Sequence, residues 1–348
     1  MGEFLLSVIA AAMLCAAGQE ARPEARYDFL GLPKNVAEEV ALKRPPFSLS
    51  DPTGPTFSEI ERTEQRKAGA ALLTQLRAAR GTFTIPPGNY RFSCLQPILL
   101  EKLHDLVVEA DGVTFWMERP PDRTTADCWG LRFLQCRNVT VRGLTIDYDP
   151  PLYIQGRIEA IDYAGCFVDI TVDEGFPVVA CRPLQVIFFR ANGEYIPQPP
   201  NFHDGVKILE NRRLRIAMKT MEQVRAQSED PKILDAFEGR SKISPGDYAV
   251  LPFRTGAALE IERCADMKFK EVTLYAAPGF AFLESGGEGG HVYERCKVIR
   301  RPGTRRLWAG NADAFHSRML EKGSRLEACE FAYVGDDFLN AHSFWHLT

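Results

Sequence analysis

Two short segments near the end of the chain carry acidic residues that are followed by similar apolar and polar residues. The first contains Asp313 and His316, and the second contains Asp336, Asp337 and Asn340. If each segment belongs to one coil of a stacked β-solenoid, equivalent residues lie about 4.8 Å apart. We favour an offset of 24 residues (340 − 316 = 24), because it pairs His316 with Asn340. The three aspartates then meet on one patch of surface.

Clustered carboxyl groups suggest acid–base chemistry. Neighbouring carboxylates cannot all ionise freely, so at least one should keep its proton to higher pH. Glycoside hydrolysis uses this difference, since one carboxylic acid protonates the leaving oxygen and one carboxylate activates water or attacks the sugar. An Asp-Asp pair after glycine is also common in plain turns. Because adjacent strand residues point to opposite faces, Asp336 and Asp337 can act together only at the entrance of a strand.

Other polar and aromatic residues close to the aspartates in the sequence are candidates for binding a sugar. An indole can stack on a pyranose ring, and a guanidinium can orient hydroxyl groups or lower the pKa of a carboxyl group. The alternative for the basic loop that precedes Asp313 is a solvated surface. The candidate substrate-binding residues are His316, Asn340, His342, Trp308 and Arg305.

Apolar runs recur along the chain at intervals that are typical of a solenoid. The run Leu259–Glu262 is followed by Phe280–Leu283 (280 − 259 = 21), and Ala314 follows after a further 34 residues (314 − 280 = 34). The second interval requires a longer loop. This pattern predicts an all-β protein built on a parallel β-helix. A chance recurrence of short strands in a sandwich is the alternative.

Four cysteines support the stacked arrangement, because each follows an apolar strand. Buried cysteine behaves as a small hydrophobic residue, so we expect an internal ladder of thiols, with disulfides as the alternative. Close Cys-x-x-Cys spacing is absent from the sequence, and we expect no metal site. The four residues are Cys136, Cys264, Cys296 and Cys329.

The remaining sequence divides into five segments. Phe4–Ala17 is an apolar run that is too short to span a bilayer, so residues 1–18 are predicted as a signal peptide. Residues 19–55 are predicted as an extended segment, 56–151 as a capping helix with the first coils, 152–254 as an inserted small antiparallel β-barrel, and 255–348 as the coils that carry the aspartates. We therefore expect a secreted or periplasmic protein with no membrane partner after cleavage.

The predicted cap begins with the capping-box pattern Ser58–Glu61 and continues as a helix to Arg80. A solenoid needs such a lid, because its first coil would otherwise expose an apolar end and an open edge. The predicted apolar stripe of this helix contains Ile60, Ala68, Ala71, Leu72 and Leu76.

The length and net charge of the chain indicate which classes of binding partner to expect. The chain has 348 residues, 45% of them hydrophobic, and a net charge of −4. This length allows a substantial core. The slight acidity argues against nucleic acid as a partner.

The acidic motifs resemble those of family 110 glycoside hydrolases, which are exo-acting α-1,3-galactosidases of the pectin-lyase-like superfamily. The similar segments are Ala312–His316 and Gly335–Asn340. The resemblance implies a right-handed parallel β-helix interrupted by a small β-barrel, and substrates that are oligosaccharides or polysaccharides with terminal galactose. It also implies an inverting mechanism without metal or cofactor, with Asp336 as the acid and Asp313 and Asp337 as base and water-holder.

This chain departs from the family pattern at its end. Family members continue with further coils after the Asp pair, whereas this sequence ends at Thr348. We therefore expect a truncated chain that lacks part of the substrate pocket. Three alternatives remain open: a β-helix polysaccharide lyase, a polygalacturonase-like hydrolase, and a non-catalytic carbohydrate-binding β-helix protein.

Overall fold

The computed structural model describes residues 47–119, 127–181, 183–196, 203–226 and 243–343. They belong to one compact unit that begins at Phe47. The predicted signal peptide and most of the predicted extended segment lie outside the described residues, so export stays a prediction. In the described part, no helix is long and apolar enough to cross a membrane.

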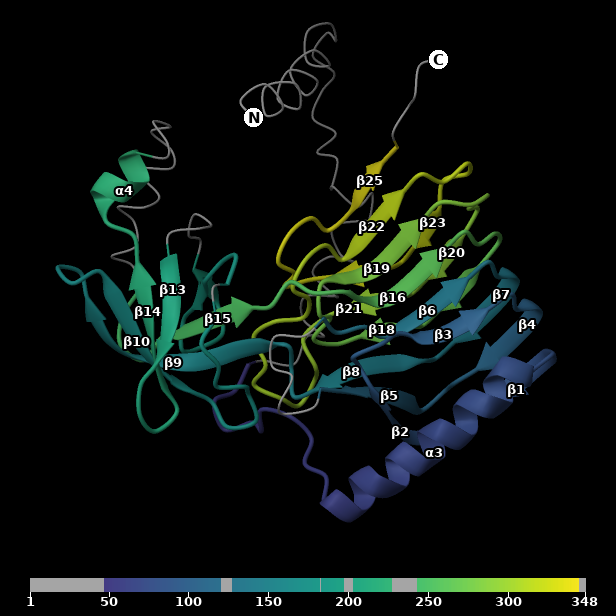
Figure 1. The fold of residues 1–348 in the computed structure, drawn as a ribbon, viewed down its shortest axis with the longest axis horizontal. Coiled ribbons are helices and arrows are strands. Elements are labelled where there is room, and N and C mark those ends of the chain that lie inside the picture. Colours follow the sequence, from purple (N-terminus) through teal and green to yellow (C-terminus); the bar gives the residue numbers. More distant parts are fainter. Residues whose placement is uncertain (1–46, 120–126, 182, 197–202, 227–242, 344–348) are drawn as a thin grey trace, which may run out of the picture. The chain divides into compact units, whose positions relative to one another are not determined.

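Three parallel sheets of six strands each form the larger part of the fold (Figure 1). Sheet A contains β1 (Gly81–Thr84), β4 (His104–Glu109), β7 (Arg137–Arg142), β17 (Lys268–Lys270), β20 (Val292–Glu294) and β23 (Arg325–Glu327). Sheet B contains β2 (Gly88–Ser93), β5 (Val113–Glu118), β8 (Thr145–Asp149), β18 (Thr273–Leu274), β21 (Lys297–Val298) and β24 (Glu330–Phe331). Sheet C contains β3 (Ile98–Glu101), β6 (Leu131–Leu134), β16 (Ala257–Glu262), β19 (Phe280–Ser285), β22 (Phe315–Arg318) and β25 (Asn340–His342). The chain visits A, B and C in turn, so each circuit is one coil.

Successive coils stack in register around an apolar interior. Leu259 pairs with Leu131 on one side and with Phe282 on the other, and Phe282 pairs with Phe315. All four side chains are buried. The offsets are 23 residues from β16 to β19 (282 − 259 = 23) and 33 from β19 to β22 (315 − 282 = 33). The predicted intervals of 21 and 34 are wrong because the apolar runs begin at different points of successive strands.

The cysteines form two short ladders instead of one. In each case a residue with positive φ turns the chain, and the cysteine that follows it contacts the coil below. All eight cysteines of the described residues are free thiols. The turn pairs are Gln135–Cys136 and Arg263–Cys264 between sheets C and A, and Arg295–Cys296 and Ala328–Cys329 between sheets A and B.

The capping helix α3 (Glu59–Ala78) begins at Ser58 with both hydrogen bonds of the capping box, as predicted. Its buried face differs from the predicted stripe, because helical spacing places Gly69 in line with Leu72 and Leu76. Ile60, Ala68 and Ala71 are exposed.

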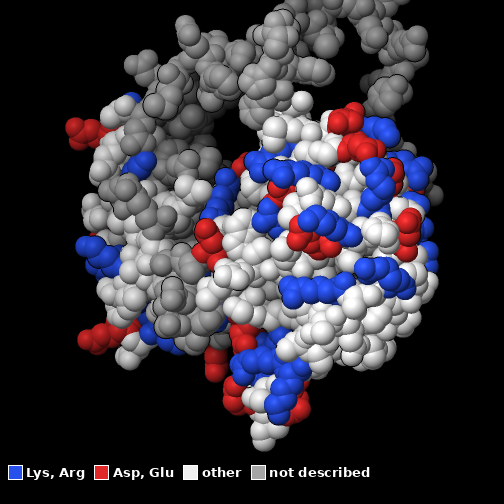
Figure 2. All heavy atoms as spheres, turned by 45° about the vertical axis from the view of Figure 1, so that its right-hand side comes forward, with Lys and Arg blue, Asp and Glu red and all other residues white. Residues whose placement is uncertain are grey.

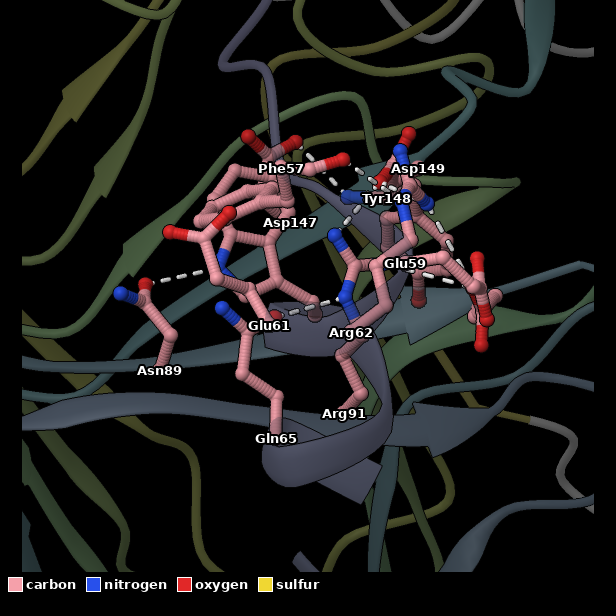
Figure 3. A network of polar contacts seen from close by, with 12 residues as sticks. Phe57, Glu59, Glu61, Arg62, Gln65, Asn89, Arg91, Asp147, Tyr148 and Asp149 are labelled. Carbon is pink, nitrogen blue, oxygen red and sulfur yellow. Dashed lines mark hydrogen bonds and ion pairs between the residues drawn. The ribbon is translucent and has the colours of Figure 1, made fainter.

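Ion pairs fasten this helix to sheet B (Figure 3). Arg62 of the helix and Arg91 of β2 both contact Asp149 of β8, at 2.8 and 2.7 Å. Arg91 also donates a hydrogen bond of 2.7 Å to Gln65 of the helix. The cap is therefore held by partly buried polar contacts as well as by its apolar face.

An antiparallel sheet of seven strands interrupts the coils between β8 and β16. Its strands pair in the order β12, β11, β15, β9, β10, β14 and β13. The edge strands β12 and β13 are joined through residues 197–202, which lie outside the described residues, so the predicted closure into a barrel stays a prediction. The bounds are β9 (Tyr153–Asp162), β10 (Phe167–Val172), β11 (Ile187–Phe189), β12 (Tyr195–Ile196), β13 (His203–Ile208), β14 (Arg213–Met218), α4 (Met221–Arg225) and β15 (Tyr248–Pro252).

Positive and negative side chains lie interspersed on the face that Figure 2 shows. On sheet A, cross-strand ion pairs join Arg142 to Glu109 at 2.8 Å and Lys270 to Glu294 at 2.7 Å. Such partly exposed pairs contribute little stability each. They do, however, balance charge along the coil surface.

Candidate active site

The three aspartates lie in the turns that lead from sheet B to sheet C in two successive coils. Asp313 precedes β22, and Asp336 and Asp337 precede β25. The strands β22 and β25 are parallel neighbours, with His316 beside Asn340. The predicted offset of 24 residues is therefore confirmed. The aspartate pair also lies at a strand entrance, where adjacent side chains can reach one site.

Asp313 is the most enclosed of the three, with 3% of its surface exposed. One of its carboxylate oxygens lies 2.7 Å from Nδ1 of His316. Nε2 of His316 lies 3.1 Å from Nε2 of His342. When Asp313 is ionised, the Nδ1–H of His316 donates to it, and a neutral His316 then accepts a hydrogen bond from His342.

An aromatic ring borders this chain of polar groups. The ring of Phe280, at the start of β19, is centred 4.6 Å from the imidazole of His316. The sequence pattern does not single out Phe280, because this residue occurs in an ordinary apolar run. Phe280 lies two residues before the inward-facing Phe282, in phase with it, and is only partly buried at the start of the strand, so no local pattern distinguishes it from a core residue.

Asp337 keeps its proton to higher pH than an ordinary aspartate. Its pKa is raised above the ordinary value, first by partial desolvation and then by the negative charges of Asp336 and Asp313. Asn340 donates a hydrogen bond of 3.1 Å to one of its oxygens. The direction agrees with the prediction that one clustered carboxyl is hard to ionise. The raised pKa belongs to Asp337, whereas the family resemblance implies that Asp336 is the acid.

Asp336 has a cationic partner that sequence analysis missed. Arg254 donates a hydrogen bond of 2.5 Å to its carboxylate. The same guanidinium donates to the backbone carbonyls of Asn311 and Gly335, both at 3.1 Å. Because Arg254 lies 82 residues before Asp336 (336 − 254 = 82), at the end of the insert, no local pattern connects the two.

The asparagine of the Asn-x-Asp motif is an anchor for the insert. Asn311 is fully buried, and its amide nitrogen contacts the carbonyls of Leu152, Phe253 and Pro278 at 2.6, 2.9 and 3.1 Å. Leu152 and Phe253 are the two ends of the inserted segment. Asn311 therefore ties both ends to the coil that carries Asp313.

Two predicted substrate-binding residues lie elsewhere. Trp308 is 5% exposed and packs against Phe189 of the insert, with ring centres 6.1 Å apart. A buried indole offers no free face for a sugar. Arg305 donates to the carbonyl of Leu49 at 3.0 Å and faces Asp173 at 3.7 Å. Neither residue belongs to the aspartate cluster, whereas His316, Asn340 and His342 do.

The cluster offers proton transfer as its chemistry. It holds a carboxyl group with a raised pKa, a buried carboxyl group bonded to an imidazole, and a carboxylate paired with a guanidinium. In the part of the chain that the structure describes, no group of three or more His, Cys, Asp or Glu side chains could hold a metal ion.

Comparison with known proteins identifies a relative. The chain is 22% identical over 254 residues to alpha-1,3-galactosidase B of Bacteroides thetaiotaomicron. The chain is a distant homologue of a glycosidase. The alignment covers 70% of this chain and 39% of the relative, so the match spans about two-fifths of that protein's length. No family model matches the chain.

Proposed function

We propose that this protein is an exo-acting glycoside hydrolase that removes terminal α-linked galactose from an oligosaccharide or polysaccharide with inversion. The convergence of Asp313, Asp336 and Asp337 at the entrance of neighbouring strands carries the proposal. The resemblance to family 110 and the relationship to alpha-1,3-galactosidase B support the choice of sugar. In this proposal the three-sheet coil is a right-handed parallel β-helix.

The proposed mechanism gives each aspartate one task. Asp337 protonates the leaving oxygen, because its pKa is raised. Asp313, oriented by His316, takes the proton of the attacking water. Asp336, held by Arg254, fixes the water or a sugar hydroxyl. In this assignment Asp337 is the acid, whereas the family resemblance implies Asp336 as the acid.

The main experiment is an assay on a saccharide that ends in α-1,3-linked galactose, followed by proton NMR. We expect β-galactose as the first product, since inversion reverses the anomeric configuration. Asp313→Asn, Asp336→Asn and Asp337→Asn should each lower turnover by roughly 10²- to 10⁴-fold, the range of acid–base contributions. Unchanged circular dichroism would show that the fold survives.

A second substrate separates the acid from the other aspartates. With an aryl galactoside whose phenol leaves without protonation, Asp337→Asn should recover much of its activity, whereas Asp313→Asn should not. Recovery by Asp336→Asn alone would return the acid role to Asp336. Full activity of all three variants would exclude the proposed site. Sugar binding without turnover by the unaltered protein would indicate a carbohydrate-binding protein, and unsaturated products would indicate a lyase.

A further inference from the structure

The insert contributes side chains to the turn that carries Asp336. Arg254 follows the last strand of the insert, and Gln185 precedes β11 within it. Both contact the backbone next to Asp336, and Arg254 also contacts its carboxylate. We propose that the insert is a working part of the acidic site, in which Arg254 and Gln185 are positioning residues for Asp336. The catalytic side of this inference rests on the proposed function.

The peptide before Asp336 is held on both sides. The carbonyl of Gly335 accepts hydrogen bonds from Gln185 at 2.8 Å and from Arg254 at 3.1 Å. The backbone N–H of Gly335 donates a hydrogen bond of 2.9 Å to the carbonyl of Gly310. A carbonyl oxygen has two lone pairs, so these two donors fill its capacity. The direction in which Asp336 leaves the turn is therefore set by two residues of the insert.

The turn approaches both the preceding coil and the insert too closely for a larger residue at position 335. A Cβ on Gly335 would lie 2.5 Å from the carbonyl oxygen of Asn311 and 2.7 Å from Nε2 of Gln185. Glycine thus allows the contact between the turn and the insert.

Arg254 is itself fixed from both directions. On its amino side, Phe253 donates to the carbonyl of Leu152 at 3.2 Å. On its carboxyl side, Thr255 donates to the carbonyl of Pro278 at 3.0 Å. The planar guanidinium then reaches three acceptors at once, a geometry that lysine cannot reproduce.

This contact is better suited to positioning than to stabilising the fold. The side chains of Arg254 and Asp336 are 28% and 48% exposed, and exposed ion pairs stabilise proteins little. Small displacements of a catalytic group, in contrast, can cost about 10²-fold in rate. Loss of Arg254 should therefore affect turnover far more than thermal stability.

The test compares Arg254→Ala, Arg254→Lys and Gln185→Ala with Arg213→Ala, a matched control within the insert. Arg213 also contacts an aspartate, Asp169, which keeps a second arginine partner in the control. Hydrogen exchange of the peptide 333–340 reports on the turn without any substrate. We expect faster exchange in Arg254→Ala and Gln185→Ala, and no change in Arg213→Ala.

Kinetics provide the second measurement. Arg254→Ala should lower kcat roughly 10- to 100-fold with a smaller change in KM, and Arg254→Lys should recover only part of the loss. Unchanged exchange in Arg254→Ala would overturn the positioning role. Faster exchange with unchanged kcat would overturn its catalytic relevance. If the unaltered protein hydrolyses no galactoside, the proposed function fails, while the exchange measurement still decides the positioning role.

Discussion

Two buried carboxyl groups of this protein, Asp313 and Glu284, have different surroundings. Asp313 lies beside the other two aspartates, and its carboxyl group is within hydrogen-bond distance of His316. Glu284 points into the coil interior, where Tyr293 and Ser324 donate hydrogen bonds of 2.8 and 2.6 Å to one of its oxygens. Its second oxygen has no hydrogen-bond partner within the described part of the chain.

We expect His316→Ala to lower turnover while the fold survives. A hydrogen bond to a charged group is worth about 1.5–3 kcal/mol, so the rate should fall roughly 10- to 100-fold if Asp313 loses its orientation. His104→Ala is the matched control, because His104 is exposed on β4. Steady-state kinetics on a galactoside measure both. Equal activity of the two variants would exclude a role for His316.

Glu284→Gln should stabilise the protein at neutral pH. Burial raises the pKa of Glu284, so the folded state binds the proton more tightly than the unfolded state. The stability that depends on this proton is fully present below the unfolded pKa and is lost as pH rises through the folded value. Glutamine does not titrate and keeps the acceptor oxygen, so the variant should gain over the unaltered protein across that window.

Urea unfolding at pH 4 and pH 8 measures the effect. The difference between Glu284→Gln and the unaltered protein should be larger at pH 8. A difference that stays constant or shrinks as pH rises would show that the fold does not raise the pKa of Glu284.

At the scale of elements, the capping helix depends on a close approach. Gly69 lies on the buried face of α3, and a Cβ there would lie 2.5 Å from the carbonyl oxygen of Arg91 in β2. Helix propensity alone favours alanine over glycine by about 1 kcal/mol. The tertiary contact opposes this preference.

Gly69→Ala should therefore destabilise the protein, by about 1–3 kcal/mol for an overpacked contact. Ala70→Gly is the control on the exposed face of the same helix, where the propensity cost of about 1 kcal/mol should appear alone. Thermal unfolding measures both variants. A rise in Tm for Gly69→Ala would show that the helix can move away from β2.

At the scale of the whole molecule, one buried carboxylate joins distant parts of the chain. Asp147 of β8 is fully buried and contacts Arg301 and Arg306, both at 2.7 Å. Arg306 also donates to the carbonyl of Thr53 at 3.1 Å. The segment before α3, an early coil and the loop before Asp313 therefore meet at this point.

Asp147→Asn should destabilise the protein by about 3–5 kcal/mol, because it leaves a buried guanidinium without its counter-charge. Asp266→Asn is the control, since Asp266 is half-exposed and faces Arg137 at 3.6 Å. Thermal or urea unfolding measures the difference. Equal stability of the two variants would show that the buried guanidinium of Arg306 does not depend on Asp147 as its counter-charge.

Local patterns predicted many of the elements, because they depend on neighbours in the sequence. The capping box at Ser58 and the strands of the insert required only spacing and turn residues. The stacking of Asp313 beside the Asp336–Asp337 pair also followed, since an in-register coil converts a sequence offset into a spatial contact. The predicted intervals were wrong because the apolar runs that were compared begin at different points of successive strands.

The sequence by itself determined the repeating coil, its capping helix and the grouping of the three aspartates with His316, Asn340 and His342. Periodic patterns encode contacts between successive coils, so these features can be read along the chain. Only the tertiary structure decided that Arg254 pairs with Asp336 and that Asn311 contacts the insert. It also decided that Trp308 and Arg305 lie outside the aspartate cluster. Those contacts join segments that no repeat relates, and packing around the insert decides which side chains reach the site.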